Sequence, residues 1–212
     1  MVLRPRVVIN VAQSLNGMIA GTSGRRVNIS SNEDLVRVHY LRAGMDAILV
    51  GANTVINDDP KLLVDRNLVR ADRQPVRIVM DRKLKTPVDA RILDGSGKTV
   101  IYTSRNTGNL ENAEIRVRSE TQLKIENILS ELYDSGIRNL MVEGGKEVIL
   151  EFVEAGCVDE FYLFIGNVLI EEGGLRLFNP QTEIKDIIID VKPMERGVLI
   201  SLDPHYLVRS WK

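Results

Sequence analysis

Residues 46–60 read DAILVGANTVINDDP, an apolar run that ends in a glycine and is followed by a polar turn, a threonine and two aspartates. The run at 47–50 predicts a buried strand, Gly51 ends it, and Thr54 stands where a helical turn would begin. Backbone N–H groups left free at such a turn favour an anionic ligand, and Asp58 can accept a hydrogen bond from a ribose or amide group. The alternative is a tight turn with a threonine N-cap and a solvated aspartate pair.

Strand-like and helix-like segments alternate on both sides of this stretch. Strands are expected at residues 7–12, 47–50, 76–80, 99–103, 140–143 and 161–165. Helices are expected at residues 32–43, 122–133 and 146–155. Ser31 and Asp34 form a capping-box pattern at the first helix, and Gly136 and Gly156 are natural stops for the other two. Several strands are continuous Val, Ile and Leu runs, so the pattern predicts an α/β domain with a mainly parallel sheet.

The pattern changes after residue 174. Two strand-like runs at 187–191 and 198–202, followed by the segment 205–211, are expected to be antiparallel edge strands. The chain has no internal repeat, low-complexity tract or linker, so residues 1–212 are expected to form a single domain.

The composition excludes several classes of protein. Lys and Arg number 28 against 29 Asp and Glu, a net charge of -1, which argues against general nucleic-acid binding. The single Cys157 excludes an internal disulfide and a multi-cysteine zinc site, and it is expected to be a small buried hydrophobe. Asn10 and Gln13 interrupt the apolar run near the N-terminus, so neither a signal peptide nor a membrane span is expected. These features predict a soluble cytoplasmic protein with no metal centre.

A second glycine-rich turn, VEGGK at residues 142–146, follows another expected strand and opens the helix at 146–155. Gly144 and Gly145 at a helix start allow close approach of a ligand and direct free N–H groups at it, which suits a pyrophosphate. The pattern is not G-x-G-x-x-G, and a plain sharp turn is the alternative. Both glycine turns follow strands, and the carboxyl ends of strands are where open α/β sheets bind ligands.

These stretches together carry a resemblance to a known family. They read LNG at 15–17, HYLRAGMDAILVGANTVINDDPKL at 39–62, VRIVMDRKL at 76–84, VEGG at 142–145 and GG at 173–174. The chain resembles the riboflavin-biosynthesis reductases, NADPH-dependent enzymes that reduce a pyrimidine phosphate, and the resemblance covers nearly the whole chain. It implies a dihydrofolate-reductase-like fold, with a mixed, mainly parallel sheet, flanking helices and antiparallel C-terminal strands, and it implies a homodimer. Bacterial relatives are often fused to a zinc deaminase, but the H-x-E and paired-cysteine signature is missing here, so a free-standing reductase is expected.

The resemblance also implies a reaction. The ribosylamino side chain of 2,5-diamino-6-ribosylamino-4(3H)-pyrimidinone 5′-phosphate would open to an imine and be reduced by NADPH to the ribitylamino form. A general acid would assist by protonating the imine nitrogen, and the candidates are Glu143, Asp58 and water.

The family pattern assigns ligand contacts residue by residue. Cofactor contacts fall on Thr54, Asp58, Met80, Asp81, Arg82, Lys83, Gly144, Gly145, Lys146 and Glu147. Substrate contacts fall on Ser14, Asn16, Arg42, Leu62 and Glu143, with Arg42 as the phosphate ligand. Arg82, Lys83 or Arg105 is expected to pair with the 2′-phosphate that distinguishes NADPH from NADH. For Arg42 the alternative role is to cap the carbonyl groups at the end of its own helix.

Two positions depart from the family pattern. Asn16 stands where the family usually has aspartate, and Asp65 stands near a position that is often basic. An acid there would repel a substrate phosphate, so Arg42 and other basic residues such as Arg26 would have to bind it. His39 is expected to be a packed or surface histidine.

Two other functions remain open at the level of the sequence. One is a dihydrofolate-reductase-like pterin reductase, which would need a lone carboxylate in a pocket for the pteridine. The other is a nucleotide-binding module without turnover. Arg42 and the EGG turn favour the pyrimidine-phosphate reductase.

Overall fold

The computed structural model describes residues 3–106, 108–179 and 185–209. Its strands are β1 (Arg6–Ser14), β2 (Met18–Ala20), β3 (Ala47–Gly51), β4 (Val76–Met80), β5 (Thr99–Thr103), β6 (Glu114–Val117), β7 (Asn139–Gly144), β8 (Glu160–Gly166), β9 (Leu175–Arg176), β10 (Ile188–Met194) and β11 (Gly197–Leu202). Its α-helices are α1 (Asn32–Ala43), α2 (Ala52–Asp58), α3 (Ile125–Asp134), α4 (Lys146–Glu154) and α5 (Pro204–Arg209). Short 3₁₀ helices occur at Thr22–Gly24 and Arg91–Leu93. None of the described helices is both long and apolar enough to cross a bilayer.

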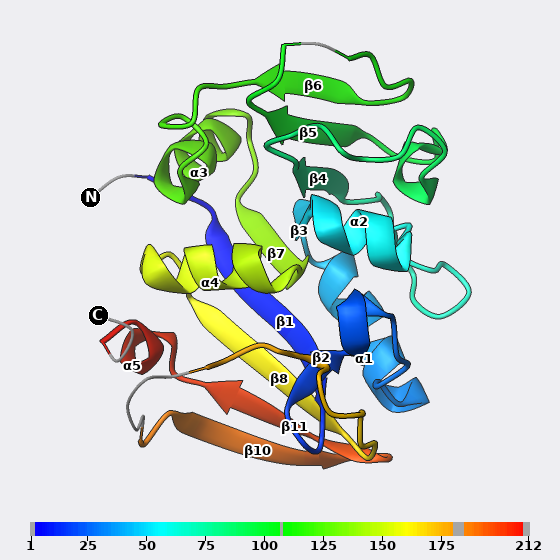
Figure 1. The fold of residues 1–212 in the computed structure, drawn as a ribbon, viewed down its shortest axis with the longest axis vertical. Coiled ribbons are helices and arrows are strands. Elements are labelled where there is room, and N and C mark those ends of the chain that lie inside the picture. The colour runs from blue at the N-terminus through cyan, green and yellow to red at the C-terminus, as the bar shows by residue number, and fades with distance from the viewer. Residues whose placement is uncertain (1–2, 107, 180–184, 210–212) are drawn as a thin grey trace.

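In the described residues, nine strands form one sheet in the order β10-β11-β8-β1-β7-β3-β4-β5-β6 (Figure 1). From β8 to β6 each strand runs parallel to the next one in this order, whereas β11 runs antiparallel to both β8 and β10. β2 and β9 form a separate antiparallel pair. The prediction of a mainly parallel sheet with antiparallel C-terminal strands is therefore confirmed.

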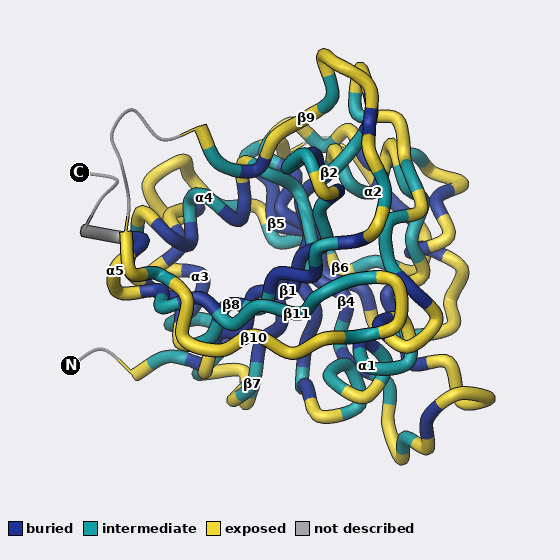
Figure 2. The backbone as a smooth tube through the Cα atoms, turned by 90° about the horizontal axis from the view of Figure 1, so that it is seen from below, coloured by how far each residue is buried: buried dark blue, intermediate teal, exposed yellow. Residues whose placement is uncertain are grey.

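The two faces of the sheet are covered by different helices. Ile9 of β1 and Leu49 of β3 pack in the cluster that includes α3 and α4, whereas Val8 and Ile48 pack in the cluster that includes α1 and α2. Successive strand residues point to opposite faces, so continuous apolar runs are what a sheet covered on both sides requires. Figure 2 shows β10 exposed along most of its length at the sheet edge, as expected for a strand with no such cover.

The C-terminal segment differs from the prediction. Residues 205–211 were expected to be an edge strand, but residues up to Arg209 belong to α5, and residues 210 and 211 lie outside the described part. The Asp203 carboxylate accepts a hydrogen bond from the backbone N–H of His205 (2.9 Å), which is the interaction that starts a helix. The prediction of a strand was wrong because the alternation of apolar residues is ambiguous over so short a segment.

The other predicted helices form with small changes at their ends. Ser31 Oγ accepts from the Asp34 N–H (3.1 Å), so the predicted cap of α1 is confirmed. α3 begins at Ile125 instead of residue 122, because Ser119 and Gln122 form a polar turn before it. β6 and the short pair of β2 and β9 were not predicted from the sequence.

Candidate active site

The two predicted glycine turns meet in the structure. β3 and β7 are neighbours, and their carboxyl ends place the turn at Gly51 beside the turn at Gly144 and Gly145. A Cβ atom on Gly144 would lie 3.2 Å from Thr54 Oγ1, and one on Gly51 would lie 3.0 Å from Val148 Cγ2. Gly145 has a φ of +82°, which side chains other than glycine rarely adopt. Glycine therefore permits the two turns to pack directly against each other.

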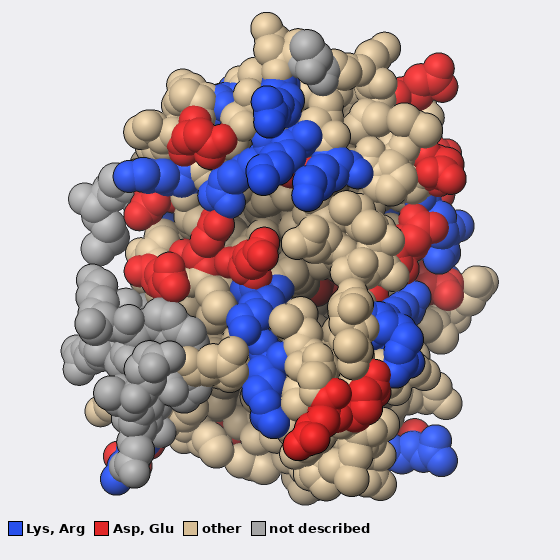
Figure 3. Space-filling model, in the orientation of Figure 1, with Lys and Arg blue, Asp and Glu red and all other residues tan. Residues whose placement is uncertain are grey.

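These turns form one wall of a cleft with a volume of about 940 Å³. Most of the predicted site residues line it: Arg42, Thr54, Asp58, Met80, Asp81, Arg82, Lys83, Glu143, Gly144, Gly145, Lys146 and Glu147. In Figure 3, Lys and Arg side chains form a band beside a hollow, and acidic side chains gather where Figure 1 has α4. Residues predicted from separate motifs therefore come together around one cavity.

Three of the predicted substrate-binding residues do not line the cleft. Ser14 Oγ donates to Asn16 Oδ1 (2.7 Å), and Asn16 Nδ2 donates to the Ile170 carbonyl (2.7 Å), so both side chains stabilise the turn between β1 and β2. Leu62 is only 3% exposed and packs in the same buried cluster as Val38 of α1. Its backbone has a φ of 51°. Ligand contacts for these three remain predictions.

Arg42 and Glu143, both predicted substrate contacts, form an ion pair with each other. Arg42 Nε donates to Glu143 Oε1 (2.6 Å) and Nη2 to Oε2 (2.5 Å), while Nη1 donates to the Leu63 carbonyl (3.0 Å). Burial alone would lower the pKa of Arg42, but the Glu143 carboxylate outweighs it and the pKa is raised. The Arg42 side chain therefore does not cap the carbonyl groups at the end of α1, which was its alternative role. The guanidinium has further N–H groups that make no hydrogen bond within the described residues, so it can still bind an anion.

Neighbouring residues in the loop after β4 have different roles. Asp81 is 2% exposed, and its carboxylate accepts from the Lys85 N–H (2.9 Å) and from both N–H and Oγ1 of Thr86 (2.7 and 2.8 Å), so it folds the loop. Arg82 donates to both carboxylate oxygens of Glu151 on α4 (2.7 and 3.0 Å). The side chains of Lys83 and Lys85 line the cleft and make no ion pair within the described residues. Arg105, by contrast, does not line the cleft.

Asp58 lies half-buried in the cleft wall. Burial raises the pKa of its carboxyl group, and the positive charge of Arg26 opposes this shift. The next residue, Asp59, faces elsewhere, because its carboxylate accepts from the Arg91 N–H (2.7 Å). Both oxygens of Glu143 are engaged by Arg42, so Asp58 is the carboxyl group better arranged to donate a proton.

Sequence reasoning missed several residues of the cleft. Leu35, which is 40% exposed, lines the cleft, as do Asn10 and Lys85. Asn10 was visible only as a polar residue that interrupts the apolar run of β1. Among the described residues, no group of His, Cys, Asp or Glu is placed to hold a metal ion.

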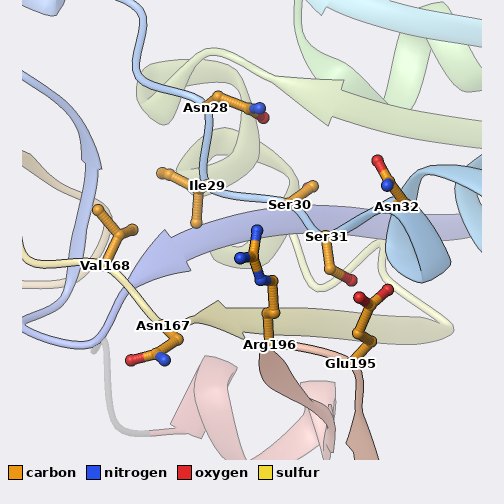
Figure 4. Close-up of a pocket in the computed structure, with 9 residues that line it drawn as sticks. All are labelled: Asn28, Ile29, Ser30, Ser31, Asn32, Asn167, Val168, Glu195 and Arg196. Atoms are coloured by element: carbon orange, nitrogen blue, oxygen red, sulfur yellow. The ribbon is translucent and has the colours of Figure 1, made fainter.

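A smaller polar pocket of about 370 Å³ adjoins the cleft. Asn28, Ile29 and Ser30 line both cavities, and Figure 4 shows this segment facing Glu195 and Arg196 from the turn between β10 and β11. The segment 28–30 is therefore a thin wall between the two cavities.

The sequence of this chain is similar to those of known proteins over most of its length. A family model described as the RibD C-terminal domain matches residues 5–195. The 2,5-diamino-6-ribosylamino-4(3H)-pyrimidinone 5′-phosphate reductase of Archaeoglobus fulgidus is 37% identical, over 79% of this chain and 83% of that protein. The protein of the same name from Methanothermobacter thermautotrophicus is 38% identical, over 79% of this chain and 80% of that protein.

Solved structures show the same architecture. A deaminase/reductase from Thermotoga maritima superposes with a TM-score of 0.82 at 26% identity, over 95% of this chain, which spans 57% of that protein. The Saccharomyces cerevisiae riboflavin biosynthesis reductase Rib7 superposes with a TM-score of 0.72 at 23% identity, over 94% of this chain and 89% of that one, which shows the fold alone. The fold is thus the dihydrofolate-reductase-like α/β fold, and the chain belongs to the RibD C-terminal domain family.

Proposed function

We propose that this chain is a reductase of riboflavin biosynthesis that converts the ribosylamino side chain of 2,5-diamino-6-ribosylamino-4(3H)-pyrimidinone 5′-phosphate to the ribitylamino form. The observation that carries the proposal is the cleft at the carboxyl ends of β3, β4 and β7, which joins two glycine turns to the Arg42–Glu143 pair. Two relatives named for this substrate, each more than a third identical, support it.

A nicotinamide dinucleotide fits the residues on one side of the cleft. The first intrahelical hydrogen bond of α4 runs from the Ile149 N–H to the Gly145 carbonyl (3.0 Å). The N–H groups of Lys146, Glu147 and Val148 precede it and are donors for a pyrophosphate. NADPH, when bound, supplies the hydride. Because Arg82 is paired with Glu151, the cations that bind the 2′-phosphate in this proposal are Lys83 and Lys85 at the rim of the cleft.

The other side of the cleft fits the substrate. Arg42 provides N–H groups for the phosphate and holds the Glu143 carboxylate in one orientation. Asp58, with its raised pKa, provides a proton for the substrate nitrogen. Orientation of the reacting groups can supply about 7–11 kcal/mol of the barrier, so no nucleophile is required. A single reductase domain over residues 1–212, a homodimer and a cytoplasmic location remain predictions.

The test is an absorbance assay with the purified protein. Loss of NADPH absorbance with the ribosylaminopyrimidinone phosphate, and not with dihydrofolate, supports the proposal. Oxidation with dihydrofolate alone would favour the pterin reductase, and oxidation with neither substrate would favour a nucleotide-binding module without turnover.

Replacing both Lys83 and Lys85 by alanine is expected to raise the Kd for NADPH about 10-fold or more and to leave the Kd for NADH unchanged. A charge-assisted hydrogen bond contributes about 1.5–3 kcal/mol, and only NADPH has the phosphate that makes one. Titration calorimetry measures both constants. Lys98→Ala is the control, because Lys98 pairs with Glu114 away from the cleft (3.0 Å). An equal loss of affinity for both cofactors would contradict this assignment.

A further inference from the structure

Asn10 and Arg37 form a hydrogen-bonded pair beside the cleft. Asn10 lies in β1, is 8% exposed and lines the cleft. Arg37 of α1 donates from Nη2 to Asn10 Oδ1 at 2.6 Å. Neither residue belongs to a sequence motif, and 27 positions separate them. The pair therefore depends on the fold, which brings α1 against the middle of β1.

A buried carboxylate holds Arg37 in place. Asp34 Oδ1 accepts from Arg37 Nε (2.9 Å) and Nη2 (2.6 Å), and the Asp34 side chain is 1% exposed. The Asp34 N–H is itself bound by Ser31 Oγ, so the position of this carboxylate is fixed by the cap of α1. Truncating one member of such a buried pair leaves the other charge uncompensated. Arg37 is thus held rigidly, with its guanidinium toward β1.

This arrangement determines which way the amide of Asn10 points. A guanidinium has only N–H donors, so the atom of Asn10 that faces it must be the oxygen. The NH2 group then points the other way, and it makes no hydrogen bond within the described residues. Among the described residues, Arg77 Nε is the only fully buried side-chain polar atom that has no hydrogen-bond partner. Asn10 Nδ2 has no partner either, so it is not fully buried. Because Asn10 lines the cleft, this NH2 group has access to it.

We propose that Arg37 and Asp34 are positioning residues that fix the Asn10 amide with its NH2 group in the cleft, where it donates to an acceptor atom of the substrate's heterocycle. The acceptor is a carbonyl oxygen or a ring nitrogen with a free lone pair. Leu35 and Val38, on the same helix as Arg37, line the cleft and provide an apolar surface for the flat ring. This inference rests on the proposed function, because it takes the pyrimidine as the ligand.

The test measures binding of the ribitylamino product, which is not reduced further, by titration calorimetry. Asn10→Ala is expected to raise the Kd for this pyrimidine about 10-fold and to leave the Kd for NADPH unchanged. Asn10→Asp is the sharper variant, because a carboxylate still accepts from Arg37 but presents no donor to the ligand. It should raise the Kd for the pyrimidine at least as much, without lowering the thermal midpoint.

Arg37→Met should raise the same Kd, and the Asn10→Ala, Arg37→Met double variant should bind no more weakly than Asn10→Ala alone. That non-additivity is expected if Arg37 acts through Asn10, and additive losses would contradict it. Arg6→Met, on the same strand but paired with Glu160 at the surface, is the control. Wild-type protein that binds no pyrimidine overturns the proposed function and this inference together. Wild-type binding with an unchanged Kd in both Asn10 variants overturns this inference alone.

Discussion

Replacing Gly144 by valine is expected to raise the Kd for NADPH by about 100-fold or more. The first added atom, Cβ, would lie 3.2 Å from both Cγ2 and Oγ1 of Thr54, which is tighter than normal packing. The branched side chain must therefore push the two glycine turns apart or enter the cleft. The first outcome moves the N–H groups at the start of α4 away from the pyrophosphate, and the second fills space that the pyrophosphate would occupy. Loss of two charge-assisted hydrogen bonds of about 1.5 kcal/mol each corresponds to a change of this size.

A matched substitution separates this effect from a general loss of stability. Gly44→Val changes a glycine at the end of α1, where a Cβ atom would make only an ordinary contact with the Leu41 carbonyl (3.5 Å). This variant should bind NADPH as the wild type does. Gly144→Ala should weaken binding less than valine, and it should cost less affinity in a Thr54→Ala background than in the wild type, because the two Thr54 atoms that it meets are then absent. Unchanged binding in Gly144→Val would contradict the placement of the pyrophosphate.

The sheet could be predicted from the sequence wherever burial on both faces left a continuous apolar run. The segments at β3, β4, β5 and β7 are of this kind, and all were predicted. β6 reads EIRV, with charged residues at two of its four positions at the sheet edge, so hydrophobicity gives no signal there. β2 and β9 contain only three and two residues, too few for any period to be detected.

The site divides in the same way between local and long-range features. The two glycine turns were found because each is a short motif that follows a strand. The partners of the charged residues were not found, because they depend on contacts between distant positions. Arg42 and Glu143 are 101 positions apart, and Arg82 and Glu151 are 69 apart. Of the three residues predicted to pair with the 2′-phosphate, Arg82 is paired with Glu151, and we therefore propose Lys83, with Lys85, for this role.

Replacing Asp58 by asparagine is expected to lower kcat about 100-fold, at the lower end of what a general acid contributes. Burial raises the pKa of this carboxyl group above the ordinary value of 3.8, so its acid form persists to higher pH than in an exposed aspartate. A proton donor is active below its pKa. The kcat of the wild type should therefore fall as the pH rises through the pKa of Asp58, and this limb should be missing from the variant. Stopped-flow or steady-state measurements over a range of pH test both points.

Asp59→Asn is the matched control, because Asp59 is adjacent in sequence but bonds to the Arg91 N–H outside the cleft. Its left-handed backbone, with a φ of 41°, is one that asparagine tolerates, so the control should fold normally. Measuring the Kd for NADPH distinguishes the two roles predicted for Asp58. A lost pH limb with an unchanged Kd identifies the proton donor. A raised Kd with an unchanged pH profile would mean that Asp58 only binds the cofactor and that water protonates the substrate nitrogen.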